Sequence, residues 1–179
     1  MCVGGIPLLH PTEEGEPMIS IESLKNVEML IGLSDEQLER VAAICEKKVY
    51  NAGDVIVREN DTSGDIYIIH KGSAEVILSG GQITAETLVA PGPRSIISLG
   101  QGQVFGEVAL IDMGPRSATV RCTSDGTELY VIHRDDFIRL CEEDTDIGYK
   151  VMRNLAADLS FKLRHRNLSW KAEVQEGES

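Results

Sequence analysis

Two hydrophobic periods divide the chain into helical and extended parts. Between residues 19 and 48 apolar residues recur every three or four positions, which predicts helix. Ser34 and Gln37 have the spacing of a capping box at a helix start. One apolar stripe then follows, formed by Leu38, Val41, Ala42 and Cys45. The first part of the chain is therefore predicted to be helical.

From Tyr50 onward the period becomes two. Short apolar runs alternate with glycine-containing turns as far as about residue 134, the pattern of an antiparallel sandwich or barrel. Residues 84–94 contain two prolines, which argue against a central strand. We therefore expect a long connection between two strands at 84–94.

After residue 134 the helical period returns. Asp135 or Asp136 could cap a short helix, and a longer helix is expected from about 145 to 170. One face of this longer helix holds Met152, Ala156, Leu159, Leu163, Arg166 and Trp170. A second row could pair with another copy of the chain or pack on the chain's own barrel, and it comprises Val151, Leu155, Leu159 and Leu163.

These patterns predict an α+β fold. Its centre is an antiparallel β-roll, a jelly-roll-like barrel, flanked by an N-terminal helix and by C-terminal helices. We expect one domain over 19–170, with the roll at about 49–134 and the C-terminal helices at about 135–170. Residues 1–18, rich in Gly, Pro and Glu, and residues 171–179 are predicted to be flexible tails.

Charge and composition restrict the partners. The formal net charge is −12, so a DNA-binding surface would act against the field of the whole chain. The four cysteines lack CxxC spacing, which favours reduced thiols in a cytoplasmic protein. The sequence shows neither a secretory signal pattern nor an apolar run of the roughly 20 residues that span a membrane. We expect a cytoplasmic protein that binds neither nucleic acid nor a membrane.

The most informative stretch is FGEVALIDMGPRSATV, residues 105–120. Gly106 lets the main chain bend tightly before a short apolar helix that begins near Glu107. Glu107 could accept hydrogen bonds from hydroxyl groups, and Arg116 offers a planar fork of donors suited to phosphate. Together these groups form a plausible cradle for a phosphorylated sugar. From spacing alone, a structural ion pair between Glu107 and Arg116 explains them equally well.

The same stretch resembles the phosphate-binding cassette of the cyclic-nucleotide-binding domain family. That family includes the sensor domains of catabolite activator proteins and the regulatory domains of cyclic-AMP-dependent kinases. The shared pattern is F-G-E-(apolar)-A-L, a turn, and R-(S/T/A)-A-(T/V), and residues 105–110 and 116–120 fit it. Upstream, NAGDVIVREND and SGDIYIIHKGSAEV are similar to the first strands of the family's β-roll. The resemblance extends over about residues 24–170.

The resemblance implies specific roles. Arg116 would neutralise a cyclic phosphate, Glu107 would accept the ribose 2′-hydroxyl, and Ser117 would add a phosphate contact. Main-chain groups would contact ribose or phosphate at Gly106, Val108, Ala109 and Ala118. With serine at 117, cyclic AMP is favoured over cyclic GMP.

The base-binding half is less marked in the sequence. In this family the last helix often closes over the purine, and the candidates for such a lid are Arg166, Asn167 and Trp170. The apolar walls could come from Ile97 and Val104. A single one of these residues is more often solvated or part of ordinary packing.

Other chemistries lack their residues. The four histidines are far apart and show no metal-ligand spacing, and no Ser–His–Asp set or phosphate-loop motif is present. We therefore expect a non-enzymatic sensor for signal transduction, without metal or cofactor, acting on an unknown effector protein. The alternatives are a protein-interaction module with a degenerate pocket and the sensor half of a DNA-binding, Crp/Fnr-like regulator.

Overall fold

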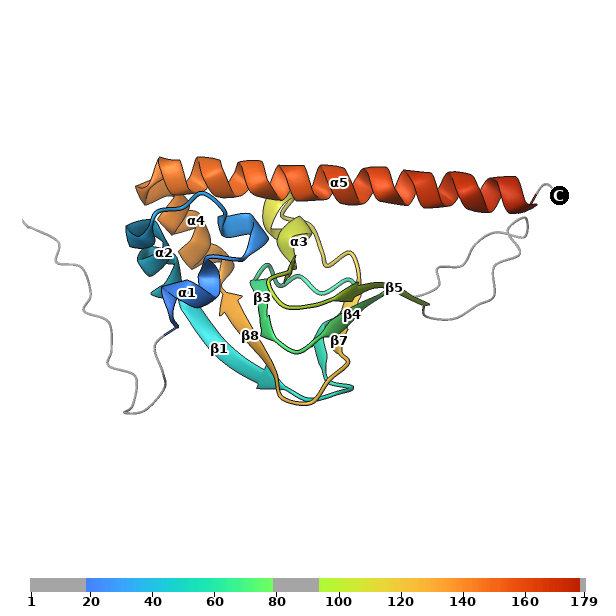
Figure 1. Cartoon of the computed structure of the whole chain (residues 1–179), viewed down its shortest axis with the longest axis horizontal. Helices are drawn as coiled ribbons and strands as arrows, with labels where there is room; N and C mark the ends of the chain where they lie inside the picture. Colours follow the sequence, from blue (N-terminus) through green and yellow to red (C-terminus); the bar gives the residue numbers. More distant parts are fainter. Residues whose placement is uncertain (1–18, 79–93, 178–179) are drawn as a thin grey trace, which may run out of the picture.

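Two four-stranded antiparallel sheets face each other in the computed structural model and form the β-roll (Figure 1). The structure describes residues 19–78 and 94–177, and for 94–96 and 165–177 it describes the backbone alone. The strands are β1 (Cys45–Tyr50), β2 (Val55–Val57), β3 (Ile66–Lys71), β4 (Ala74–Leu78), β5 (Arg94–Leu99), β6 (Val104–Phe105), β7 (Thr119–Cys122) and β8 (Thr127–Ile132). The sheet orders are β1-β8-β3-β6 and β2-β7-β4-β5.

Helices lie before, within and after the roll. They are α1 (Ile21–Leu24), the 3-10 turn η1 (Glu28–Leu30), α2 (Asp35–Ala42), α3 (Glu107–Ile111), α4 (Arg134–Glu143) and α5 (Thr145–Gly177). Figure 1 shows α5 running above α4 and α3 and then beyond them. The predicted α+β fold, a β-roll flanked by helices, is thus confirmed.

Strand alternation divides the core into two apolar clusters. On β3, Ile66 and Ile68 face the helices, whereas Tyr67 and Ile69 face the interior of the roll. The same alternation on β8 sends Tyr130 and Ile132 to the helices and sends Leu129 and Val131 into the roll. The central sheet strands are therefore apolar on both faces.

The helix-side cluster holds the first half of α5 in place. Phe137 of α4 and Ile147 and Val151 of α5 are fully buried there, and Leu155 is nearly so. The Asn154 side chain also donates to the carbonyl oxygens of Met29 and Ile31, at 3.2 and 2.8 Å. The first three turns of α5 are thus part of the domain core.

Local signals predicted some element starts correctly. The side chain of Ser34 accepts from the main-chain N–H of Gln37, and the Gln37 side chain accepts from the main-chain N–H of Ser34, as a capping box requires. The predicted long helix from about 145 begins at Thr145. The expected connection at 84–94 and the tail at 1–18 fall outside the described residues, apart from Arg94, which begins β5.

Three predicted boundaries were wrong. Residues 45–48 are not helical, because Cys45 begins β1 and pairs with Ile132 of β8. The short helix begins at Arg134 after His133, rather than after Asp135 or Asp136. Residues 171–177 continue α5, since the run KAEVQE contains good helix formers and no residue that breaks a helix before Gly177.

Candidate functional site

Residues 105–120 form a short helix, a turn and the start of a strand at one end of the roll. Gly106 joins β6 to α3 with φ +88°, a left-handed conformation that favours glycine. A Cβ atom at this position would lie 2.6 Å from Nη1 of Arg116 and 2.6 Å from the carbonyl oxygen of Asp65. Glycine at 106 therefore permits both the turn and the close approach of the arginine.

Arg116 is buried, with 3% of its surface exposed. Its Nη1 donates to the carbonyl oxygen of Gly106 at 3.1 Å, and its Nη2 donates to that of Asp65 at 2.9 Å. Its Nε donates to the hydroxyl of Ser63 at 3.1 Å. The guanidinium also lies over the ring of Tyr67, 5.7 Å from its centroid. Protein groups on three sides thus fix the direction of this cation.

The main chain of Arg116 is fixed as well. Its N–H donates to the carbonyl oxygen of Asp61 at 2.8 Å, and its carbonyl oxygen accepts from the N–H of Asn60 at 2.9 Å. Burial lowers the pKa of Arg116, while Tyr67 and the carboxylates of Asp65 and Asp61 act in the opposite direction. An arginine stays charged despite such a shift. The site therefore contains a fixed, desolvated positive charge.

Glu107 is also buried, with 6% of its surface exposed. Its Oε1 lies 3.0 Å from Nζ of Lys162 on α5, and Lys162 also pairs with Asp158 of the same helix at 2.7 Å. Burial alone would lower the pKa of Lys162, but the charge of Glu107 and the hydrogen bonds that the ammonium donates to Asp158 and Glu107 outweigh it and raise the pKa. A charged pair therefore links α3 to the second half of α5.

The structural ion pair between Glu107 and Arg116 is not formed. Arg116 binds main-chain carbonyl groups and a hydroxyl, and Glu107 binds Lys162. No ion pair among the described residues joins the side chains of Glu107 and Arg116. Each residue has a separate partner, so the two charges are held independently within one cassette.

The remaining cassette residues lie close to these two. Ala109 is buried, Val108 and Ala118 are half-buried, and Ser117 is exposed beside Arg116. The carbonyl oxygen of Ala109 accepts from Nη2 of Arg134 at 3.0 Å, which joins α3 to the first turn of α4. The cassette predicted from the sequence is therefore one continuous local structure.

Of the expected base-binding residues, the structure describes the side chains of Val104 and Ile97. Val104 belongs to the helix-side cluster, with its side chain on the far side of β6 from the roll interior. Ile97 is 41% exposed and pairs in register with Val76, which packs against the roll interior. Arg166, Asn167 and Trp170 lie on α5, but their side chains are outside the described part of the chain.

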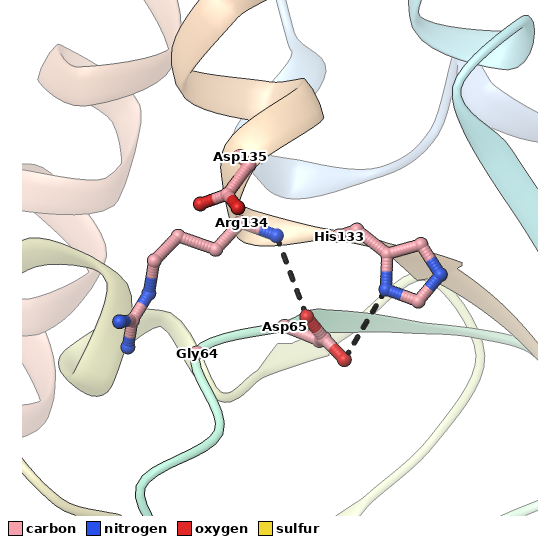
Figure 2. Close-up of a pocket in the computed structure, with 5 residues that line it drawn as sticks. All are labelled: Gly64, Asp65, His133, Arg134 and Asp135. Carbon is pink, nitrogen blue, oxygen red and sulfur yellow. Dashed lines mark hydrogen bonds and ion pairs between the residues drawn. The ribbon is translucent and has the colours of Figure 1, made fainter.

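A cavity of about 350 Å³ lies between the chain just before β3 and the start of α4 (Figure 2). Its lining comprises Gly64, Asp65, His133, Arg134 and Asp135. Asp65 approaches Nδ1 of His133 and the main-chain N–H of Arg134, both at 3.4 Å, as Figure 2 shows. Neither Glu107 nor Arg116 lines this cavity, and its lining includes both acidic and basic side chains. Arg134, which lines it, bonds the cassette at Ala109. We therefore interpret the residues around the cavity as support for the cassette, and not as the ligand site.

Sequence reasoning missed four residues that build the site. Ser63, Asp65 and Tyr67 hold the guanidinium of Arg116, and Lys162 binds Glu107. Asp65 acts through its carbonyl oxygen, which any residue type supplies, so no side-chain signal marks it. Lys162 is a polar residue on a helix whose charged positions are usually solvated, and only the path of α5 reveals its partner.

The described residues show neither a metal site nor a membrane span. No group of three or more His, Cys, Asp or Glu residues in the described part of the chain is arranged to hold a metal ion. Within that part, no helix is both long enough and apolar enough to cross a bilayer.

Comparison with known proteins identifies the family. The model of the cyclic nucleotide-binding domain matches residues 47–144, more than half of the chain. This chain belongs to the cyclic nucleotide-binding domain family. The resemblance predicted from residues 105–120 is thereby confirmed, and the matched segment includes the whole cassette of this cyclic nucleotide-binding domain.

Individual relatives agree with the family assignment. The cGMP-dependent protein kinase, isozyme 1, of Drosophila melanogaster is 31% identical over 80% of this chain, which spans 18% of that protein. The cyclic AMP receptor protein of Thermus thermophilus is 28% identical over 81% of the chain, which spans 61% of that protein. The crystal structure of the Thermus thermophilus catabolite activator protein matches with a TM-score of 0.65 and 27% identity, covering 80% of this chain and 62% of that one.

Gly106→Ala tests whether glycine is needed for the packing of Arg116. Gly53 is a matched control, because it has φ +90° and no atom within 4 Å of an added Cβ. Both alanines bear the strain of a positive φ, about 1–2 kcal/mol, and overpacking adds about 1–3 kcal/mol at position 106 only. Urea unfolding should show the larger loss of stability for Gly106→Ala, and equal losses would contradict the role of the clash.

Proposed function

We propose that this domain is a non-enzymatic regulatory module that binds a cyclic nucleotide, with cyclic AMP favoured over cyclic GMP. The observation that carries the proposal is the fixed guanidinium of Arg116 beside α3, in a family of cyclic nucleotide-binding domains. A buried cation of fixed orientation suits a cyclic phosphate, which carries one negative charge. Glu107, next to Gly106 in the same cassette, would accept a ribose hydroxyl.

The preference for cyclic AMP over cyclic GMP rests on a single residue, Ser117. Relatives named for cyclic AMP and for cyclic GMP both match the chain. Ser117 follows Arg116 directly and is exposed, so its hydroxyl is free to approach a ligand from solvent. Serine rather than threonine at this place is the feature that favours cyclic AMP.

The role in the cell follows from the same features. We propose a cytoplasmic sensor in signal transduction that uses no metal or cofactor and acts on an effector protein. Cys45, Cys122 and Cys141 are free thiols, which suits a reducing compartment. Burial raises the pKa of Cys45 to about 12, so this thiol stays protonated and unreactive at neutral pH.

Arg116→Ala tests the binding function directly. Loss of hydrogen bonds to a charged group costs about 1.5–3 kcal/mol, so affinity should fall roughly 10- to 100-fold. Isothermal titration with cyclic AMP and cyclic GMP measures both the loss and the preference between them. Arg121→Ala is the control, because Arg121 is a half-exposed residue that pairs with Glu75 at 2.6 Å on the surface of the roll.

Two results would oppose the proposal. An Arg116→Ala variant that remains folded by circular dichroism and binds as well as the parent would remove the phosphate role of Arg116. A parent domain whose melting temperature shifts with neither cyclic nucleotide would favour the protein-interaction module with a degenerate pocket, since a ligand of the folded form raises that temperature.

A homodimer through α5 is proposed on a separate observation. Leu155 and Val151 of the expected pairing row are buried in the domain's own core, so these two residues cannot contact a second copy of the chain. The neighbouring row has heptad-like spacing of three and four and remains largely accessible. It comprises Tyr149, Met152, Ala156, Leu159 and Leu163, of which Tyr149 is 65% and Leu163 is 62% exposed and Leu159 alone is half-buried.

Leu163→Glu tests the dimer. A charge in the centre of an apolar helix pair should weaken dimerisation about tenfold or more. Sedimentation equilibrium of the parent and the variant measures the change. Ala157→Glu adds the same charge nearby, at an exposed position turned away from the row, and should leave the dimer unchanged. A parent that sediments as a monomer at all concentrations would contradict the proposal.

A further inference from the structure

From residue 156 to residue 164, where the description of its side chains ends, α5 is packed less firmly than in its first three turns. Up to Leu155 the helix buries a side chain in the core on each turn. Beyond it Ala156 and Ala157 are exposed, and Phe161 and Leu163 are each 62% exposed. Such a helix can remain attached through its first three turns while the following segment moves, because residues 156–164 include no fully buried side chain to oppose the movement.

Lys162 connects this second half to the cassette. Its Nζ lies 3.0 Å from Oε1 of Glu107, and Asp158, one turn earlier, holds the same ammonium at 2.7 Å. Lys162 keeps 31% of its side chain exposed, whereas Glu107 keeps 8%. The pair thus lies at the edge of the site, with the carboxylate beneath the helix and the ammonium at the boundary with solvent.

Glu107 is consequently covered on the side where a sugar would approach it. Its hydrogen-bonding partner is Lys162, and its carboxylate is almost inaccessible to solvent. With Lys162 bound to Oε1 and 6% of the residue exposed, Glu107 offers a ribose hydroxyl little access while the helix segment around Lys162 stays in place. Ligand and helix therefore compete for one carboxylate.

We propose that Lys162 is a latch that holds the second half of α5 over the cassette. The hydroxyl of a bound cyclic nucleotide displaces Lys162 from Glu107. This inference rests on the proposed function for the identity of the ligand. It assigns to Lys162 a positioning role, in which occupancy of the sugar site changes the position of α5. A ligand shifts such an equilibrium only through its different affinities for the two arrangements, and displacement of the ion pair supplies that difference.

The latch makes an unusual prediction for binding. If only the released arrangement accepts ligand, the measured affinity is reduced by the fraction of molecules that are released. Lys162→Met removes the charge while retaining the length of the side chain, and should therefore tighten cyclic AMP binding by roughly tenfold. Lys162→Arg keeps an ion-pairing cation and should bind about as the parent does.

A matched control separates the latch from the general effect of charge. Lys150 also lies on α5 and pairs with Asp146 at 2.6 Å, away from the cassette. Lys150→Met removes the same charge and should leave the affinity near that of the parent. Isothermal titration measures the affinity of the parent, Lys162→Met, Lys162→Arg and Lys150→Met for cyclic AMP. Weaker or unchanged binding by Lys162→Met would overturn the latch.

A second measurement needs no ligand. Hydrogen exchange of the main-chain amides of residues 158–164 should be faster in Lys162→Met than in the parent, Lys162→Arg or Lys150→Met. Equal exchange in all four proteins would overturn the latch. If the parent binds no cyclic nucleotide, the proposed function and the competition fail together, while the exchange rates still decide whether Lys162 holds α5.

Discussion

The guanidinium of Arg116 lies between the carbonyl groups of Gly106 and Asp65, and the rest of the site depends on this arrangement. These two bonds fasten the turn after α3 to the end of β6 and to the start of β3. They also require glycine at 106, because any Cβ atom there would occupy the space of the guanidinium and of the Asp65 carbonyl. Main-chain atoms thus set the position of the cation, and the Ser63 hydroxyl and the Tyr67 ring add to them.

The second charge of the site is held by a very different contact. Glu107 binds a flexible lysine from a helix segment that has few buried side chains. A ligand hydroxyl at Glu107 would replace the hydrogen bond that the buried carboxylate loses, and Lys162, which is 31% exposed, would keep Asp158 as a partner, so this contact can be exchanged for another. In the proposed function, a fixed phosphate contact at Arg116 and a replaceable sugar contact at Glu107 would together let a small ligand change the position of a long helix.

Much of this could be predicted from the sequence, because the relevant signals are local. The alternation of strand residues, the capping box at Ser34 and the compact run from Phe105 to Val120 each depend on neighbours in the chain. The boundary at Cys45 failed for the same reason, since its apolar character suits a helix stripe and a strand end equally well. Pairing with Ile132, far along the chain, decided between them.

The partners of the two charges could not be predicted in this way. Arg116 is held by carbonyl oxygens that leave no trace in the residue types, and Lys162 meets Glu107 only because α5 passes over α3. A structure of the domain bound to cyclic AMP tests the account most directly. The account predicts phosphate at Arg116, a ribose hydroxyl at Glu107, and Lys162 out of hydrogen-bonding range of Glu107. A bound nucleotide with the Lys162–Glu107 pair intact, or one bound away from Arg116, would contradict it.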